Sequence, residues 1–347
     1  MLYEKEDAQE YKEEVDSVDD EGDSVVIRQK ISRKKRKFLF LWMVIYVIAI
    51  VIIVCVLVRN SLERDKKEQE EKQKTLLTQV EEMEDRYGIN IMWEGRFSEE
   101  RANEFSKKPS MTGDEEKIKY ALGEIESILE RFPEGFFDEY KEETVPDFKC
   151  EYVDVYLCEN IVSDTMTDGV RAACTDAYHK CNGMYVLIDV NQKEIFKRGV
   201  AHELFHVIEN KIGFVSVYNS YNNNEIMKGI YVDWQKCNPN GYKYLSFGNN
   251  QDVIHVFEGD LPYDINTEKI ENVYFVNKYA QLSDQEDRAE TFSFLIACDD
   301  ADDLPESYNS PHVKEKAKLI VDMIDDTFEC VDDNAYWARM YHEKYGD

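Results

Sequence analysis

The sequence predicts an α+β domain that follows a single transmembrane helix, and three observations support this fold class. Residues 38–58 (FLFLWMVIYVIAIVIIVCVLV) form an apolar run without a charged residue, glycine or proline. Downstream, the segments 89–93, 151–158 and 183–190 have the composition and periodicity of strands. Helical periodicity prevails after residue 190, so we expect a small twisted sheet followed by a mostly helical C-terminal lobe.

The apolar run predicts a membrane-spanning helix, because about 20 helical residues cross the hydrocarbon core of a bilayer. The run is longer and farther from the N-terminus than the apolar region of a cleaved signal peptide, so we expect a retained anchor. Basic residues are denser before the run, at 33–37, than after it. This bias predicts a single-pass cell-membrane protein with a cytoplasmic N-terminus and an extracytoplasmic domain. Residues 1–37, with 11 acidic and 9 basic groups, predict a disordered cytoplasmic tail.

Residues 59–86 predict a helical stalk, because they lack glycine and proline and are rich in Glu, Lys, Gln and Leu. The apolar residues Leu76, Leu77, Val80 and Met83 span too few turns to sustain a long heptad pattern. A solvated spacer is therefore favoured, and a stalk-mediated dimer remains the alternative.

The composition argues against nucleic acid as a partner, since a chain with a formal net charge of -30 repels phosphate backbones. The folded domain, expected over residues 87–347, holds seven of the eight cysteines. Cys150 with Cys158, and Cys174 with Cys181, are the pairs closest in sequence. Either pair could close a short loop in an oxidising compartment.

A helix is predicted directly after the third strand, in the segment NQKEIFKRGVAHELFHVIENKIG. Asn191 is a suitable N-cap and Gly213 a suitable C-terminal stop, with apolar residues at helical spacing between them. Within this segment, His202 and His206 are four residues apart, so both imidazoles stand on one helix face and can bind one tetrahedral zinc ion. Glu203 lies beside them, where it can accept a proton from a water molecule that attacks a carbonyl carbon.

A catalytic zinc needs a third protein ligand, and candidates lie in YAQLSDQEDRAETFSFLIA, residues 279–297. Ser283 or Asp284 can cap a helix that places Glu286 and Glu290 on one face. One carboxylate can bind zinc while the other accepts the second N–H of a ligand histidine. Acidic residues in a first helical turn often only answer the helix dipole, but the histidine pair favours the metal site.

Together the two segments resemble a gluzincin, the branch of zincin metallopeptidases that combines H-E-x-x-H with a downstream Glu. The closer similarity is to the anthrax lethal factor catalytic domain and the related Pro-Pro endopeptidases, in which a tyrosine precedes the zinc-binding Glu in a Y-x6-E-x-x-A-E-x-F pattern. Tyr279, Glu286, Ala289, Glu290 and Phe292 match this pattern.

The resemblance implies a zincin-like metallopeptidase domain with Zn2+ as its cofactor. The implied roles are zinc ligand for His202, His206 and Glu286, general base for Glu203, hydrogen-bond donor to the oxyanion for Tyr279, and partner of a ligand histidine for Glu290. It also implies that the strand 183–190 is the edge strand that binds an extended peptide substrate.

The stretch between His206 and Tyr279 is longer than expected for this group, so a preference for proline in the substrate is not carried over. Its aromatic residues Tyr242, Tyr244 and Phe247 either line substrate subsites or fill the C-terminal core. The remaining histidines are not expected to bind metal: His179, His255, His312 and His342.

The sequence therefore predicts a membrane-anchored zinc endopeptidase that acts on peptides or proteins. One alternative is a catalytically silent zincin scaffold with a binding or signalling role, against which the complete motif argues. Another is a zinc amidase that acts on cell-wall peptides, because a Lewis acid and a base do not specify the acyl group.

Overall fold

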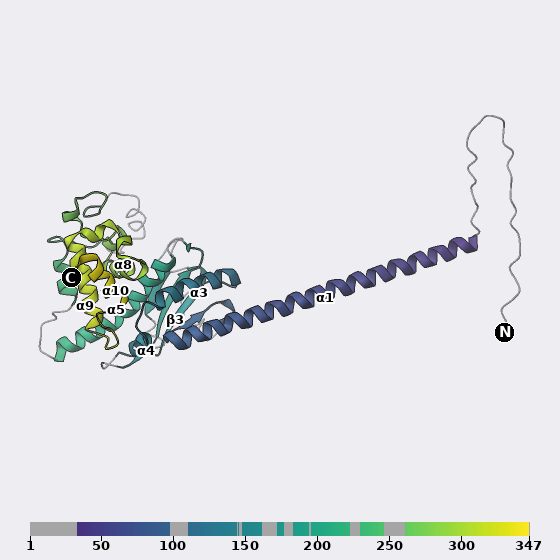
Figure 1. Cartoon of the computed structure of the whole chain (residues 1–347), viewed down its shortest axis with the longest axis horizontal. Coiled ribbons are helices and arrows are strands. Elements are labelled where there is room, and N and C mark those ends of the chain that lie inside the picture. Colours follow the sequence, from purple (N-terminus) through teal and green to yellow (C-terminus); the bar gives the residue numbers. More distant parts are fainter. Residues whose placement is uncertain are drawn as a thin grey trace, which may run out of the picture. The chain divides into compact units, whose positions relative to one another are not determined.

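The structure is a computed structural model that describes residues 33–97, 110–143, 145, 148–161, 172–176, 183–193, 196–222, 230–245 and 261–346. The chain divides into two compact units, Met1–Glu70 and Glu71–Asp347. The first unit contains the apolar part of the long helix α1, and the second contains the described strands and the other helices (Figure 1).

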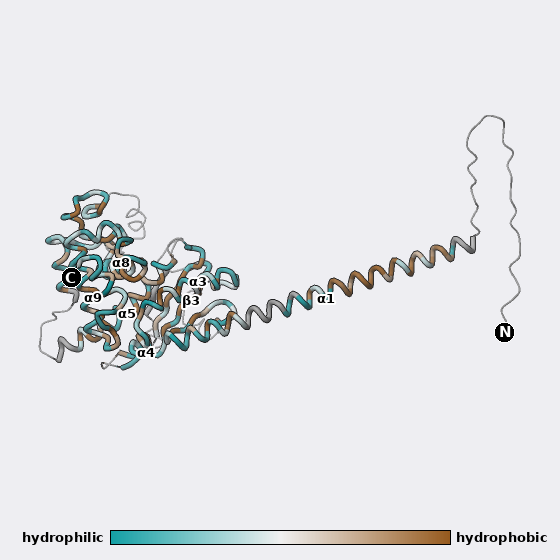
Figure 2. The backbone as a smooth tube through the Cα atoms, in the orientation of Figure 1, coloured by the Kyte–Doolittle hydropathy of each residue, from teal (hydrophilic) through white to brown (hydrophobic). Residues whose placement is uncertain are grey.

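Helix α1 (Arg33–Tyr87) contains the predicted membrane span. Its segment Lys37–Arg64 is the one segment of the described chain that is long and apolar enough to cross a membrane. Large apolar side chains such as Trp42 and Ile53 are exposed along it, and Figure 2 shows the continuous hydrophobic stretch. Such a surface is unfavourable in water and suits a lipid environment. Residues 1–32 of the predicted tail lie outside the described residues.

The C-terminal end of the predicted stalk belongs to the second unit. Leu76, Val80 and Met83 are buried in the main hydrophobic core of that unit. Their spacing places them on one face of α1, and the chain's own domain covers this face. Glu84 also accepts a hydrogen bond from the backbone N–H of Ile91 at 2.7 Å. The last turns of the stalk are therefore part of the domain, which differs from the solvated spacer that we expected.

A small, largely parallel sheet forms one layer of this unit. Its strands are β1 (Asn90–Met92), β2 (Ser110–Met111), β3 (Tyr152–Asn160), β4 (Ala172–Asp176) and β5 (Gly183–Asp189). The order is β1-β3-β5-β4; β1, β3 and β5 are parallel, β4 is antiparallel to β5, and β2 pairs antiparallel with β3. The three predicted strands correspond to β1, β3 and β5. The expectation that β5 is the edge strand is wrong, because β4 pairs with its outer side.

Helices make up most of the remaining fold, which is α+β with mostly helical content. The helices after α1 are α3 (Glu115–Leu129), α4 (Phe136–Lys141), α5 (Phe196–Asn222), α6 (Ile230–Lys236), α8 (Asp284–Ala297), α9 (Pro311–Asp325) and α10 (Tyr336–Tyr345). Single turns of 3-10 helix are η1 (Glu94–Arg96), η3 (Ile270–Asn272), η4 (Tyr279–Gln281), η5 (Ala301–Asp303) and η6 (Glu306–Asn309). Helix α5 contacts α3, β4 and β5 as well as α8 and α9, so it lies between the sheet and the C-terminal helices.

Helix α5 differs at both ends from the prediction. Asn191 lies in the turn after β5, and the helix is described from Phe196 onward, so Asn191 is not its N-cap. Gly213 does not end the helix. Phe214 and Val215, which follow it, pack against the main core, and their partial burial outweighs the low helix propensity of glycine.

The structure does not contain the disulfide considered between Cys150 and Cys158, since both thiols are free and buried. Cys158 lies within the extended strand β3, which begins two residues after Cys150. An extended chain rises about 3.3 Å per residue, and this separates two cysteines that a disulfide would need within about 7 Å. The side chains of Cys174 and Cys181 lie outside the described residues.

Candidate metal centre

Two helices bring the predicted metal ligands together. In α5, Ala201, Leu204 and Phe205 are fully buried and hold the helix in the core. His202 and His206, one helical turn apart, project from α5 toward the first turns of α8. The motif therefore occupies the middle of a helix that is fixed on several sides by packing.

The start of helix α8 is defined by a side-chain cap. Ser283 Oγ accepts a hydrogen bond from the backbone N–H of Glu286 at 3.1 Å, so Ser283 is the N-cap and Asp284 is the first helical residue. This cap places Glu286 in the first turn, with Glu290 one turn later on the same side.

The two histidines and Glu286 converge on one point. His202 Nε2 lies 2.8 Å from Glu286 Oε2 and 3.1 Å from His206 Nε2, and His206 Nε2 lies 3.6 Å from Glu286 Oε2. Ligand atoms about 2.1 Å from a tetrahedral zinc ion are about 3.4 Å from one another. The three atoms thus match the donor types and the spacing of a zinc site, and His202, His206 and Glu286 form the candidate metal cluster of the described residues.

Glu290 occupies a different position from Glu286. Its Oε1 lies 2.8 Å from His202 Nδ1, the ring nitrogen that faces away from the cluster. Its Oε2 accepts a hydrogen bond from the side-chain amide of Asn277. The same Asn277 accepts a hydrogen bond from the backbone N–H of Ala280 at 3.0 Å through Oδ1. Glu290 is thereby held in place to orient the ring of His202.

Negative charge dominates the electrostatics of the cluster. Burial raises the pKa of Glu286, but the two histidines outweigh burial and hold this pKa well below its ordinary value. Burial lowers the pKa of His206, but Glu209 and Glu286 outweigh burial and raise this pKa to about 9. For His202, Glu286 and Glu290 likewise overcome burial and raise the pKa well above its ordinary value. The site therefore favours positive charge at its centre, as protons or as a metal ion.

The predicted base and the predicted oxyanion donor lie beside this cluster. Glu203 is buried, with 7% of its surface exposed, and follows His202 in α5. The ring of Tyr279, in η4, lies edge-on to the ring of His202 with 5.8 Å between centroids. Burial and the nearby carboxylates Glu286 and Glu203 raise the pKa of Tyr279 far above its ordinary value, so its phenol stays protonated and can donate a hydrogen bond.

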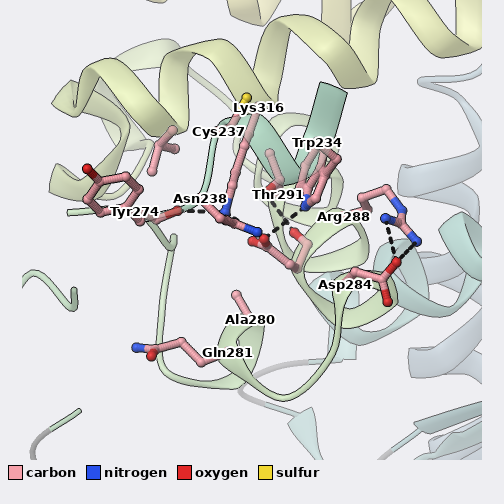
Figure 3. A network of polar contacts seen from close by, with 12 residues as sticks. Trp234, Cys237, Asn238, Tyr274, Ala280, Gln281, Asp284, Arg288, Thr291 and Lys316 are labelled. Carbon is pink, nitrogen blue, oxygen red and sulfur yellow. Dashed lines mark hydrogen bonds and ion pairs between the residues drawn. The ribbon is translucent and has the colours of Figure 1, made fainter. Parts of the chain in front are cut away.

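Two further residues at the site, Glu209 and Arg288, were not predicted from the sequence. Glu209 Oε2 lies 3.8 Å from His206 Nδ1, and Glu209 Oε1 accepts a hydrogen bond from Arg288 Nε. The guanidinium also donates to Asp284 Oδ2 at 3.1 Å (Figure 3). The spacing of His206 and Glu209, three residues apart on one helix, is the signal that could have identified this carboxylate.

A separate buried network lies on another face of α8 and centres on Asp287. Figure 3 shows two of its members, Trp234 and Lys316. Lys316 Nζ donates to Asp287 Oδ2 at 2.6 Å and to the carbonyl of Tyr274 at 2.7 Å. The same carboxylate oxygen accepts from the Tyr244 hydroxyl at 2.8 Å and from Trp234 Nε1 at 3.0 Å. This network joins α6, α8 and α9 around a fully buried ion pair.

The structure shows where two of the aromatic residues between His206 and Tyr279 lie. Tyr244 belongs to the network, and Tyr242 packs against Phe275 with ring centroids 4.9 Å apart, so both fill the C-terminal core. Phe247 lies outside the described residues. Among the other histidines, His312 stacks on Tyr274. His342 lies beside Tyr341, and His179 and His255 lie outside the described residues.

Comparisons with known proteins provide one distant structural similarity. No family model and no curated protein matches the sequence. The structure aligns with a crystal structure, at 2.10 Å resolution, of a "putative zinc-binding metallo-peptidase" from Bacteroides caccae. The alignment covers 80% of this chain and 93% of that chain, with 12% identity and a TM-score of 0.34. A TM-score of this size does not establish a shared fold, so a functional assignment depends on the residues of this chain.

Proposed function

We propose that this chain is a membrane-anchored zinc endopeptidase of the gluzincin type, with a zincin-like catalytic domain. The observation that carries the proposal is the convergence of His202 Nε2, His206 Nε2 and Glu286 Oε2, three zinc-type donor atoms at 2.8 to 3.6 Å from one another. This convergence occurs between two helices, beside the buried carboxylate of Glu203. A structural ion pair would not need two imidazole nitrogens to meet at one carboxylate oxygen.

In this proposal His202, His206 and Glu286 hold zinc, and Glu290 orients His202 through its Nδ1 atom. Zinc bound there supplies a Lewis acid that polarises the scissile carbonyl and lowers the pKa of a water molecule. With three protein ligands, this set would match the ligand count of a catalytic zinc site.

Glu203 and Tyr279 perform the remaining chemistry in the proposal. Glu203 accepts a proton from the attacking water and passes it to the leaving amine, so that one carboxylate serves as base and then as acid. Tyr279 remains protonated and donates a hydrogen bond to the oxyanion that develops on the carbonyl oxygen. Strand β4, rather than β5, is the edge to which an extended peptide substrate would add.

The anchoring helix determines where this chemistry takes place. We propose that the segment Lys37–Arg64 spans the cell membrane, with the basic residues at 33–37 on the cytoplasmic side and the peptidase domain outside. Peptides or proteins at the outer face of the membrane are then the substrates. Accessibility of Glu71–Asp347 to an added protease in intact cells would test this orientation.

The proposal is tested with the full chain in detergent micelles and a mixed peptide library, with cleavage products identified by mass spectrometry. We expect cleavage that a zinc chelator abolishes and added zinc restores. Glu203→Gln should retain zinc but lower kcat by about 10²- to 10⁴-fold, because the general base is lost.

The outcomes separate the proposal from its alternatives. Zinc binding without cleavage of any peptide would favour a silent scaffold, and cleavage restricted to cell-wall peptides would favour an amidase. A wild-type chain that binds no zinc, or a Glu203→Gln variant that cleaves peptides as fast as wild type, would refute the proposed mechanism.

A further inference from the structure

Each of the two candidate ligand histidines has a carboxylate facing its second ring nitrogen, at 2.8 Å for His202 and at 3.8 Å for His206. His202 Nδ1 faces Glu290, which the amide of Asn277 holds. His206 Nδ1 faces Glu209, at 3.8 Å. A metal-binding histidine almost always has a carboxylate, carbonyl or water at its second ring nitrogen, because this partner fixes the tautomer and the ring orientation. Glu209 is the carboxylate that faces this nitrogen of His206, at a distance longer than a direct hydrogen bond.

Glu209 is held by Arg288. The Glu209 carboxylate is 8% exposed and Arg288 is 1% exposed, and Arg288 Nε donates to Glu209 Oε1. This contact leaves the other carboxylate oxygen, Oε2, directed at His206. Both terminal nitrogens of the guanidinium donate to Asp284 Oδ2 at 3.1 Å. The planar guanidinium therefore has a fixed direction, which a lysine ammonium in the same place would not have.

The contact also connects the two helices that carry the ligands. Glu209 lies on α5, three residues after His206, and Arg288 lies on α8, two residues after Glu286. A buried pair that lost one partner would leave an uncompensated charge, so the pair resists separation of the two helices next to the metal site. It therefore acts on the distance between the histidines and Glu286 as well as on the ring of His206.

We propose that Glu209 and Arg288 form a positioning pair for the metal centre, in which Arg288 fixes Glu209 and Glu209 orients His206 through Nδ1. This inference rests on the proposed zinc site and deepens it. Neither residue needs to touch substrate. Their effect should appear as zinc affinity and as the geometry of the bound metal.

The test measures the zinc dissociation constant of the full chain in detergent by competition with a chromophoric chelator. Glu209→Gln, which keeps the side-chain volume, should weaken zinc binding by about 10- to 100-fold. The matched control is Glu84→Gln, which makes the same substitution in another Glu–Arg pair, where Glu84 of α1 contacts Arg96 of η1 at 2.6 Å. This control should bind zinc as tightly as wild type.

A second measurement separates positioning from a general loss of structure. Cobalt(II) replaces zinc as a probe, and its visible absorption spectrum reports ligand geometry. We expect an altered spectrum for Glu209→Gln and for Arg288→Lys, and a wild-type spectrum for Glu84→Gln. If Glu209→Gln does not fold, as judged by circular dichroism, Arg288→Lys gives the same test, because it retains the positive charge and removes the directed donor.

Different results would refute the positioning pair and the proposed zinc site. Zinc binding to wild type with unchanged affinity and spectrum in Glu209→Gln and Arg288→Lys would overturn the positioning pair alone. Equal weakening of zinc binding by Glu84→Gln would overturn it as well, because the effect would then be one of general charge. A wild-type chain that binds no zinc would overturn the proposed function and with it this inference.

Discussion

Two faces of helix α8 carry carboxylates with little exposed surface, and the faces differ in the partners that those carboxylates meet. On one face, Glu286 and Glu290 contact the two nitrogens of the His202 imidazole. On the other, Asp287 contacts the ammonium group of Lys316, and both of these side chains are fully buried. Adjacent residues of one helix therefore lie in two different electrostatic settings.

The difference shows what makes a buried carboxylate a candidate metal ligand. Lys316 is a cation that is covalently part of the chain, and its ammonium group donates to Asp287 Oδ2 at 2.6 Å, so this carboxylate already has a cation beside it. The imidazoles opposite Glu286 are neutral donors once they lose their protons, and the negative charge of the carboxylates then needs another cation. On this helix, the acid that meets two imidazole nitrogens is the one that fits a zinc site.

Among variants of the two faces, Glu286→Gln should have the largest effect on zinc binding and hydrolysis. Replacing the carboxylate with a neutral amide removes the negative ligand, so zinc binding and hydrolysis should fall below detection. The measurement is zinc content after dialysis, with peptide cleavage in parallel. Asp287→Asn is the matched control on the next residue, and its folded fraction should keep zinc. Loss of zinc from Asp287→Asn alone would reverse the assignment of the two faces.

The next largest effect is expected on stability, from a variant of the Asp287–Lys316 ion pair. Lys316→Met should lower the free energy of unfolding by about 3 to 5 kcal/mol, because it leaves the buried Asp287 carboxylate without its cation. Denaturant titration of residues 71–347 measures this change. The double variant Asp287→Leu/Lys316→Met should recover part of the loss, since replacing both charges with apolar groups removes the desolvation penalty, while Trp234 Nε1 and the Tyr244 hydroxyl lose their acceptor. A double variant no more stable than Lys316→Met would contradict this account of the ion pair.

Two tyrosines allow a smaller, paired comparison. Tyr279→Phe on the metal face should lower kcat by about 10²- to 10³-fold, because it removes one hydrogen bond to the oxyanion. Zinc content and the unfolding midpoint should remain those of wild type. Steady-state kinetics with a cleaved peptide measure the effect, and an unchanged kcat would exclude Tyr279 from the chemistry.

The smallest effect is expected from Tyr244→Phe. The Tyr244 hydroxyl donates to Asp287 Oδ2 at 2.8 Å, and losing this bond should cost about 1 to 3 kcal/mol of stability. The kcat of Tyr244→Phe should equal that of wild type, because the Tyr244 hydroxyl faces the Asp287–Lys316 ion pair and not the candidate metal site. A loss of kcat as large as that of Tyr279→Phe would mean that the two faces are coupled.

Local patterns in the sequence predicted the elements that carry the site. The four-residue spacing of His202 and His206 and that of Glu286 and Glu290 place each pair on one helix face, and Ser283 is a suitable N-cap for the second helix. These features depend on neighbours within one or two turns. The structure then brings His202, His206 and Glu286 together, as the motif suggested.

Features that depend on distant partners could not be predicted. The order of strands places β4 outside β5, and no local pattern contains that order. Nothing near Asp287 in the sequence predicts its buried ion pair, because its partner Lys316 comes from α9. The extension of α5 beyond Gly213 likewise depends on packing of Phe214 against Phe148, which lies far away in the sequence.

Whether His202, His206 and Glu286 bind zinc can be tested directly by anomalous X-ray diffraction at the zinc absorption edge. The crystals would contain residues 71–347 and be grown with zinc. The account predicts one strong anomalous peak about 2.0 to 2.2 Å from His202 Nε2, His206 Nε2 and a carboxylate oxygen of Glu286. A peak bound by other residues, or no peak at this cluster in crystals that contain zinc, would contradict the claim that these three side chains form a zinc site.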